Sequence, residues 1–171
     1  TIRLTSGGCT GAYSMLSGPG LVTNTGTIVV DPANGGGRYL RADVRNQGTI
    51  RVDQPLEYDT VGATLTNEGT VTLTQVMTVT SGSVRNLSGS IDGSGAGQLT
   101  VSASDFDQGN GDTSGNPVVV LNSDLAYLAP STGTSAFVAH QNVGLSGDLP
   151  STTSLTIEAI DTRWGIAVTE M

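Results

Sequence analysis

A short motif of alternating apolar and polar residues recurs along the first half of the chain. It reads LVTNTGTIVV at residues 21–30, DVRNQGTIRV at 43–52 and TLTNEGTVTL at 64–73, with a degenerate copy, SVRNLSGSID, at 83–92. Aligned on the central Asn, successive copies are 22, 21 and 19 residues apart. A period near 20 residues with strand-like content predicts a solenoid in which each repeat forms one coil.

The faces of the predicted strands follow from alternation, because residues two apart in a strand share a face. Counted from each Asn, positions −2, +4 and +6 are apolar, whereas positions −1 and +3 are mostly polar. The apolar, inward positions are Val22, Val44, Leu65 and Val84 at −2, Ile28, Ile50 and Val71 at +4, and Val30, Val52 and Leu73 at +6. We therefore expect an apolar core enclosed by each coil.

The later part of the chain is also strand-like. Residues 97–104, 116–129, 135–147 and 153–160 are alternating or apolar runs between Gly, Pro and Ser residues, and no segment has a helical period over twelve residues. We predict an all-β fold, a right-handed parallel β-helix with about 20 residues per coil. A length of 171 residues suits a single domain spanning 1–171.

The Asn and Gly of the repeated N-x-G triplet have a structural interpretation. Both residues tolerate corner conformations that β-branched residues resist, so the triplet marks a bend between two short strands. Stacked coils place the Asn side chains in one column at the inter-strand spacing of ~4.8 Å, where amides can hydrogen-bond to one another. This structural ladder consists of Asn24, Asn46, Asn67 and Asn86.

Three longer segments carry a resemblance to a known kind of repeat. They are FDQGNGDTSGNPVVV at 106–120, VTNTGTI at 22–28 and LSGDLPSTTSLTIEA at 145–159. Together they resemble the Gly/Thr-rich β-strand repeat units of very large secreted or cell-surface proteins of actinobacteria and related bacteria. The resemblance covers most of residues 21–160, and it implies one unit of a longer stack that acts as a spacer, adhesive or glycan-contacting module.

Composition narrows the classes of partner and of chemistry. The formal net charge is −8, and the seven basic residues are all Arg, so we expect neither nucleic acid nor an anionic membrane surface as a partner. The sequence contains no run of about 18 apolar residues, so it does not predict insertion into a membrane. A single Cys9 and a single His140 do not make an ordinary zinc site, and no G-x-S-x-G motif supports a Ser-His-Asp triad.

One acidic segment, SDFDQGNGDTSG at 104–115, breaks the repeat. Asp105, Asp107 and Asp112, with glycines between them, offer carboxylate and carbonyl oxygens of the kind that bind calcium. The EF-hand pattern is not met, because no Glu closes the loop. Two interpretations stay open: a structural calcium ion, the one cofactor that we expect if any, and a solvated turn.

A second acidic pair follows from the repeat itself. Asp31 and Asp53 both occupy position +7, so neighbouring coils would stack them about 4.8 Å apart, with Arg51 nearby. Two carboxylates this close raise one pKa or attract a cation. The third coil has Thr74 at this position. Two interpretations are therefore open: a solvated face with a partial Asp/Arg pair, and a pair of carboxylates that binds calcium or acts in catalysis.

Exposed aromatic rings are the usual platform for sugars. Tyr39 and Tyr58 lie in comparable parts of successive coils, which makes them candidate glycan-contact residues, with packing in the core or at its rim as the alternative. The leading interpretation is a non-enzymatic structural or adhesive β-solenoid module of a secreted or cell-surface bacterial protein. Its partners would be neighbouring repeats, or copies that associate through the terminal coils. The alternative is a carbohydrate-binding module, attached to a polysaccharide-degrading enzyme, with a polysaccharide as ligand.

Overall fold

The computed structural model describes residues 1–7, 11–102 and 105–116 with their side chains. Further along the chain it describes the backbone of five strands within residues 118–157. Cys9 and His140 lie outside the described residues. Within the described ranges every regular element is a strand, and none is a helix that could cross a membrane.

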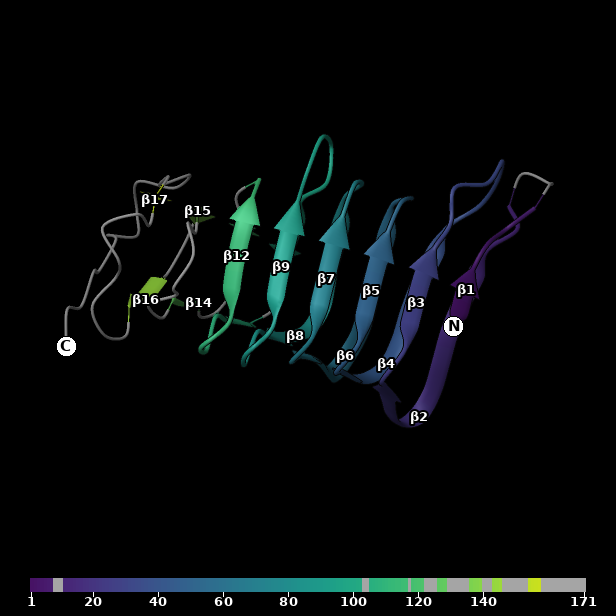
Figure 1. Ribbon diagram of the computed structural model, residues 1–171, viewed down its shortest axis with the longest axis horizontal. Coiled ribbons are helices and arrows are strands. Elements are labelled where there is room, and N and C mark those ends of the chain that lie inside the picture. Colours follow the sequence, from purple (N-terminus) through teal and green to yellow (C-terminus); the bar gives the residue numbers. More distant parts are fainter. Residues whose placement is uncertain are drawn as a thin grey trace.

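The strands stack as successive coils of a parallel β-solenoid (Figure 1). In chain order they are β1 (Ile2–Leu4), β2 (Ser14–Asn24), β3 (Thr27–Val30), β4 (Arg38–Asn46), β5 (Thr49–Val52), β6 (Leu56–Asn67), β7 (Thr70–Leu73), β8 (Met77–Arg85), β9 (Ser90–Gly93), β10 (Leu99–Ser102), β11 (Asp105–Asp107), β12 (Asp112–Gly115), β13 (Val118–Leu121), β14 (Ala126–Leu128), β15 (Ala136–Ala139), β16 (Val143–Leu145) and β17 (Ser154–Ile157). The solenoid has about 5 coils of roughly 22 residues each. The predicted fold class is therefore confirmed.

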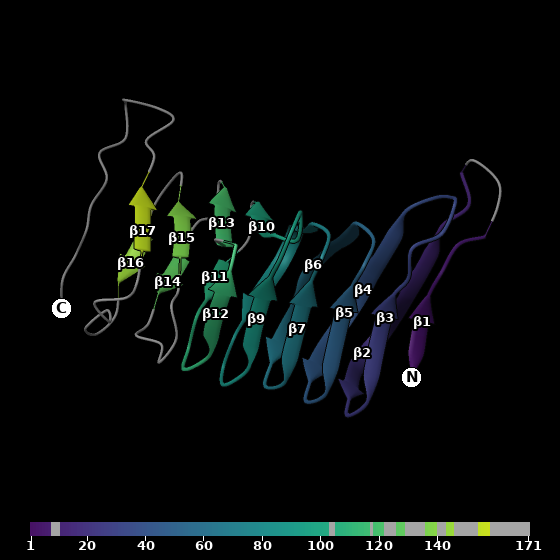
Figure 2. The ribbon, with the colours of Figure 1, turned by 45° about the horizontal axis from the view of Figure 1, so that its top comes forward.

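Two sheets form the walls of the solenoid. The short strands make one sheet in the order β1-β3-β5-β7-β9-β12, and the long strands β2, β4, β6 and β8 make the other. After β8, each long strand is replaced by two shorter ones, which continue as β10-β13-β15-β17 and β11-β14-β16 (Figure 2). In Figure 1 the short strands lie on the near face with their arrows pointing up, and successive coils advance from right to left, so the chain winds with a right-handed sense.

The long strands bend in the middle, which gives each coil three straight segments. Register shifts mark this bend between β4 and β6, from Leu40 to Val44, and between β6 and β8. Gly62 and Gly82 stand at the bend with φ of 75° and 84°, a left-handed conformation that only glycine adopts without strain. The second corner of each coil falls at the N-x-G triplet, between the long strand and the short one.

The core fills the solenoid with the side chains that alternation places inside. The register pairs like with like, so Val44 lies between Val22 and Leu65, and Ile50 lies between Ile28 and Val71. All but one of the ten predicted inward residues are buried; the exception, Val22 on the first long strand, is partly buried. The pattern of apolar positions thus predicted the core correctly.

Candidate functional site

The corner after each long strand holds the Asn side chains in a single buried column. Asn24 Nδ2 donates to Asn46 Oδ1 at 2.7 Å, Asn46 Nδ2 donates to Asn67 Oδ1 at 2.8 Å, and Asn67 Nδ2 donates to Asn86 Oδ1 at 2.8 Å. The first three amides also donate to a backbone carbonyl of the next coil, at Thr49, Thr70 and Ser90. These hydrogen bonds form the ladder that the repeat predicts.

Gln108 occupies the equivalent corner of the next coil, but it does not continue the hydrogen-bonded column: Asn86 Nδ2 donates to the Asp112 carbonyl at 2.9 Å, and Gln108 Oε1 has no partner among the described residues. The register of β8 with β11 places Phe106 beside Val84, so Gln108 takes the place that follows Asn86. Its side chain is buried and its Nε2 donates to the Gly111 carbonyl. The spacing of 22 residues from Asn86, followed by Gly, is the sequence signal that could have found it.

The glycines of the second and third N-x-G triplets, Gly48 and Gly69, are required by the space available rather than by backbone conformation. A Cβ on Gly48 would lie 2.1 Å from the carbonyl oxygen of Gly26, and one on Gly69 would lie 2.2 Å from that of Gly48. Neither Gly48 nor Gly69 has a positive φ. The triplets mark the corners, as the sequence predicts, but Gly48 and Gly69 do not adopt a left-handed conformation there. They are needed because the backbone of the preceding coil occupies the position of a side chain.

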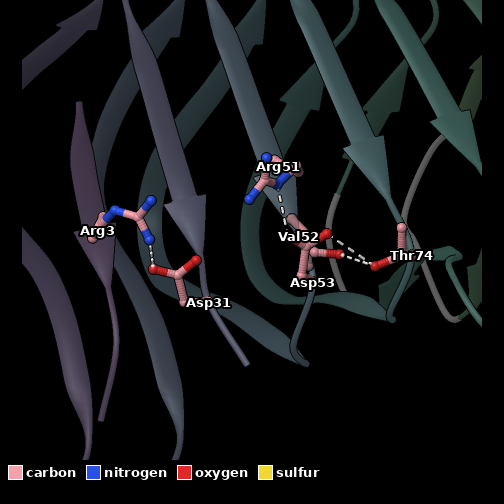
Figure 3. Close-up of polar contacts among 6 residues, drawn as sticks. All are labelled: Arg3, Asp31, Arg51, Val52, Asp53 and Thr74. Atoms are coloured by element: carbon pink, nitrogen blue, oxygen red, sulfur yellow. Dashed lines mark hydrogen bonds and ion pairs between the residues drawn. The ribbon is translucent and has the colours of Figure 1, made fainter. Parts of the chain in front are cut away.

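The outer face of the short-strand sheet carries the Asp31 and Asp53 pair (Figure 3). Asp31 is paired with Arg3, whereas Asp53 accepts from Arg51 Nε at 2.6 Å and from Thr74 Oγ1 at 3.1 Å. The two carboxylates thus point to different partners. This arrangement corresponds to a solvated face with Asp/Arg pairs.

The acidic segment is divided between two faces of its coil. Asp105 and Asp107 lie on β11, beside β8, whereas Asp112 begins β12 in the other sheet. Asp107 accepts from Arg85 Nε at 3.3 Å and from the Gly109 amide at 3.0 Å. Within residues 1–7, 11–102 and 105–116, no group of three or more His, Cys, Asp or Glu side chains could hold a metal ion. A calcium ion at this turn stays a prediction, and it would compete with Arg85 for Asp107.

Two surface ion pairs extend along the long-strand sheet. Arg41 is paired with Asp59, and this hydrogen bond raises the pKa of Arg41 further above its ordinary value. Arg45 lies 2.9 Å from Glu68, and its hydrogen bond holds the pKa of Glu68 below the usual range, aided by Gln47. These groups are largely solvated, so each pair contributes little to stability.

Of the two candidate glycan-contact residues, Tyr58 is wrongly placed for that role. It is 0% exposed, and its hydroxyl donates to the Ala42 carbonyl at 3.1 Å inside the core. Burial raises the pKa of Tyr58 above its ordinary value. The alternation of β6 explains this position, because Tyr58 lies two residues beyond Leu56, a core residue, on the same face of the strand.

Tyr39 is half-buried on the outer face, and its ring is already engaged. Arg41 lies over the ring with its guanidinium carbon 4.5 Å from the centroid. A Cβ on Gly37 would come within 2.6 Å of ring atoms, so the ring lies directly against that glycine. Tyr39 can therefore offer a hydroxyl to a ligand more readily than a ring face.

Tyr13 is the exposed ring of this region, and the sequence alone did not single it out. It is 62% exposed, and it packs edge-to-face with Tyr39 at 6.0 Å between centroids and 82° between planes. Ser14 donates its amide to the Gly37 carbonyl, which places Tyr13 one coil before Gly37. Because Gly37 has no side chain, the two tyrosines meet there.

A hollow of about 340 Å³ begins at Tyr39 and follows the solenoid axis over three coils. Its lining comes from Gly37, Arg38, Tyr39, Pro55, Leu56, Glu57 and Thr78. Tyr39, Glu57 and Thr78 are register partners on β4, β6 and β8, so they form one outward column along its length. We call this feature the axial hollow.

Arg38 lies beneath the axial hollow as a buried cation. It is 1% exposed, and its guanidinium donates to the carbonyls of Leu4, Gly35 and Gly36. Its Nη2 has no hydrogen-bond partner in the part of the chain that the structure describes. The inward parity that Arg38 shares with Leu40 is the sequence signal that could have indicated this burial.

Comparisons with known proteins give no relative for this arrangement. No protein-family model, no curated protein and no solved structure matches the chain. The part of the Gly/Thr-rich resemblance that the structure supports is the parallel, repeated solenoid itself.

Proposed function

We propose that the chain is a non-catalytic structural module, a rigid spacer or adhesive unit of a secreted or cell-surface bacterial protein. The observation that supports a structural role is the unbroken column of buried amides from Asn24 to Asn86, which ties each coil to the next through side chains as well as backbone. A solenoid built in this way transmits force along its axis through every coil, because each coil contacts only its neighbours.

The state of the surface carboxylates supports a non-catalytic role. Acid–base catalysis by carboxylates needs a pair with separated pKa values facing one site. In the described residues five carboxylates are engaged with arginines on separate parts of the surface. Release of reducing ends from a polysaccharide by the purified chain would overturn this part of the proposal.

The first long strand supports association with a neighbouring repeat or another copy. Among the described strands, β2 pairs only with β4, so its other edge is open, and open edges are templates for further strands. Leu21 on this strand is 61% exposed. Among the described residues, the Oδ1 atom of Asn24 accepts only from the backbone amide of Gly26. The later Asn residues of the ladder each accept from the Asn of the preceding coil.

Sedimentation of the purified chain over a concentration series tests this association. We expect concentration-dependent self-association that Leu21→Arg abolishes, because a charge would be buried at the added edge. Val61→Arg is the matched control, since Val61 is also exposed but lies at the bend of β6 rather than on an end coil. A strictly monomeric chain, or equal loss with both variants, would contradict the proposed partner surface.

A further inference from the structure

The axial hollow has the size and lining of a small-ligand site rather than of a packing defect. Its volume of about 340 Å³ falls within the range of ligand pockets, about 300–1,000 Å³. Its lining combines an apolar floor of Pro55 and Leu56 with polar groups from three successive coils. None of these polar groups is needed for the amide column, which lies at another corner of the coil.

We propose that the axial hollow binds an uncharged oligosaccharide, with Tyr13 as the stacking residue and Glu57 and Thr78 as hydrogen-bonding residues. This inference goes beyond the structural role and does not depend on it. It transfers the glycan-contact role from Tyr58, which is buried, to Tyr13, whose ring is open to solvent.

The position of Tyr13 suits a sugar ring. Saccharides present an apolar face of C–H groups, and exposed aromatic rings bury that face at little conformational cost. Tyr13 does not itself line the hollow, but it packs edge-to-face against Tyr39, which does, so its ring is within reach of a ligand that extends past Tyr39. Tyr39 is itself fixed by Arg41 and Gly37, so the platform is ordered before a ligand arrives.

The polar groups are spaced for an extended ligand. Tyr39, Glu57 and Thr78 stand in one column on neighbouring strands, at intervals of about 4.8 Å. All three side chains can accept hydrogen bonds from the hydroxyls of successive sugar rings, and the hydroxyls of Tyr39 and Thr78 can also donate to them. Thr80 Oγ1 donates to Glu57 Oε1 at 3.4 Å, which orients the carboxylate. A chain of sugars lying along the axis would meet one group per coil.

Electrostatics favours an uncharged ligand over an acidic one. Glu57 contributes a negative charge to the hollow, and the whole chain has a net charge of −8. Of the cations nearby, Arg41 is paired with Asp59. Arg38 is 1% exposed and donates to the carbonyl groups of Gly35 and Gly36, and its Nη2 has no partner among the described residues. A uronic acid or sulfated sugar would therefore place an unpaired anion beside a carboxylate, which is unfavourable.

NMR titration of the isotope-labelled full chain tests the proposal. The neutral probes are cellohexaose and xylohexaose, and the acidic probe is hexagalacturonate. We expect a neutral probe to shift the amides of Gly37, Glu57 and Thr78. Tyr13→Ala should weaken its binding about tenfold, the effect of one aromatic contact, and Glu57→Gln should weaken it less. Hexagalacturonate should bind more weakly than the neutral probe.

Two matched controls separate the site from general surface effects. Val61→Ala removes an exposed apolar side chain from the bend of β6, and Asp53→Asn removes a carboxylate from another face; neither should change the dissociation constant. Circular dichroism checks that all four variants fold. The proposal is overturned if no neutral probe binds, if the shifts map elsewhere, if Tyr13→Ala binds like the wild type, or if hexagalacturonate binds best.

Discussion

At the buried corner and on the outer face, contacts between neighbouring coils have the same spacing, but they contribute differently to the stability of the solenoid. At the corner, Asn46 and Asn67 are 0% exposed, and Asn46 Nδ2 donates one hydrogen bond to Asn67 Oδ1 at 2.8 Å. On the outer face, Arg45 and Glu68 come from the same two coils, but their charges remain in contact with water. Stacking alone therefore does not decide how much a contact contributes.

Solvent explains the difference. A buried polar group without its partner costs about 1–3 kcal/mol, whereas an exposed ion pair contributes about 0–1 kcal/mol. Substitutions at the corner should accordingly disrupt the solenoid, and substitutions on the outer face should leave it intact. Four predictions test this comparison, in decreasing order of expected effect.

Gly69→Ala should have the largest effect. Its Cβ would lie 2.2 Å from the Gly48 carbonyl oxygen, and separating the coils would break ladder hydrogen bonds, so we expect a loss of about 3 kcal/mol in the free energy of unfolding. Gly26→Ala is the matched control, because nothing lies within 4 Å of a Cβ there. Urea unfolding measures both; equal losses would contradict the role of close approach.

Asn67→Ala should cost about 2 kcal/mol, because Asn86 Oδ1 and the Ser90 carbonyl lose a buried donor. Gln47→Ala removes a neighbouring amide that makes one exposed hydrogen bond, to Glu68, and it should change stability by less than about 0.5 kcal/mol. Chemical unfolding of both variants provides the measurement. Similar values for the two would mean that the amide column is not the stabilising feature of the corner.

Tyr58→Phe should cost about 1 kcal/mol at neutral pH, the net value of one hydrogen bond to Ala42. Burial raises the folded-state pKa of Tyr58, so the folded protein retains a proton that the unfolded chain loses above about pH 10. Stability should therefore fall as pH rises beyond that point, by about 1.4 kcal/mol per pH unit.

The Phe variant should lack this alkaline loss of stability. Tyr13→Phe removes an exposed hydroxyl and should keep the wild-type pH dependence. Unfolding curves between pH 8 and pH 11, as the tested range for both variants, provide the measurement. A wild-type slope in Tyr58→Phe would show that another group causes the alkaline effect.

Glu68→Gln should have the smallest effect. The folded-state pKa of Glu68 is lowered, chiefly by Arg45, so its contribution is present above the ordinary Glu pKa and is lost as pH falls through the folded value. Wild type and variant should differ slightly at neutral pH and converge in acid or in high salt. Thermal unfolding in these three conditions measures the difference, and a gap that persists in high salt would argue against an ion-pair effect.

The core was predictable because alternation repeats in every coil. Ile28, Ile50 and Val71 occupy equivalent positions in three motif copies, and a single slip in register would have exposed all of them. The Asn ladder was predictable for the same reason. Both predictions depend only on the period of the sequence and on the geometry of stacked strands.

The remaining features depend on side-chain neighbours that no period reveals. Tyr58 looked equivalent to Tyr39, but a shift in register places Tyr58 opposite Leu40, inside, and Tyr39 opposite Glu57, outside. Tyr13 lies outside the repeated motif, so its contact with Tyr39 was not accessible from alignment. Gln108 was not predicted because the repeated motif has Asn at this position, whereas this coil places a longer amide at the same corner.

The hydrogen bonds of the amide column all point in one direction, which gives the solenoid a polarity along its axis. Asn24, Asn46 and Asn67 each donate to the Oδ1 atom of the Asn in the following coil, so the side-chain dipoles align head to tail. Aligned hydrogen bonds polarise one another, as the peptide dipoles of a helix add along its axis. The column is thus a polarised chain of amide hydrogen bonds, in which reversing or deleting one amide weakens the hydrogen bonds on both sides of it.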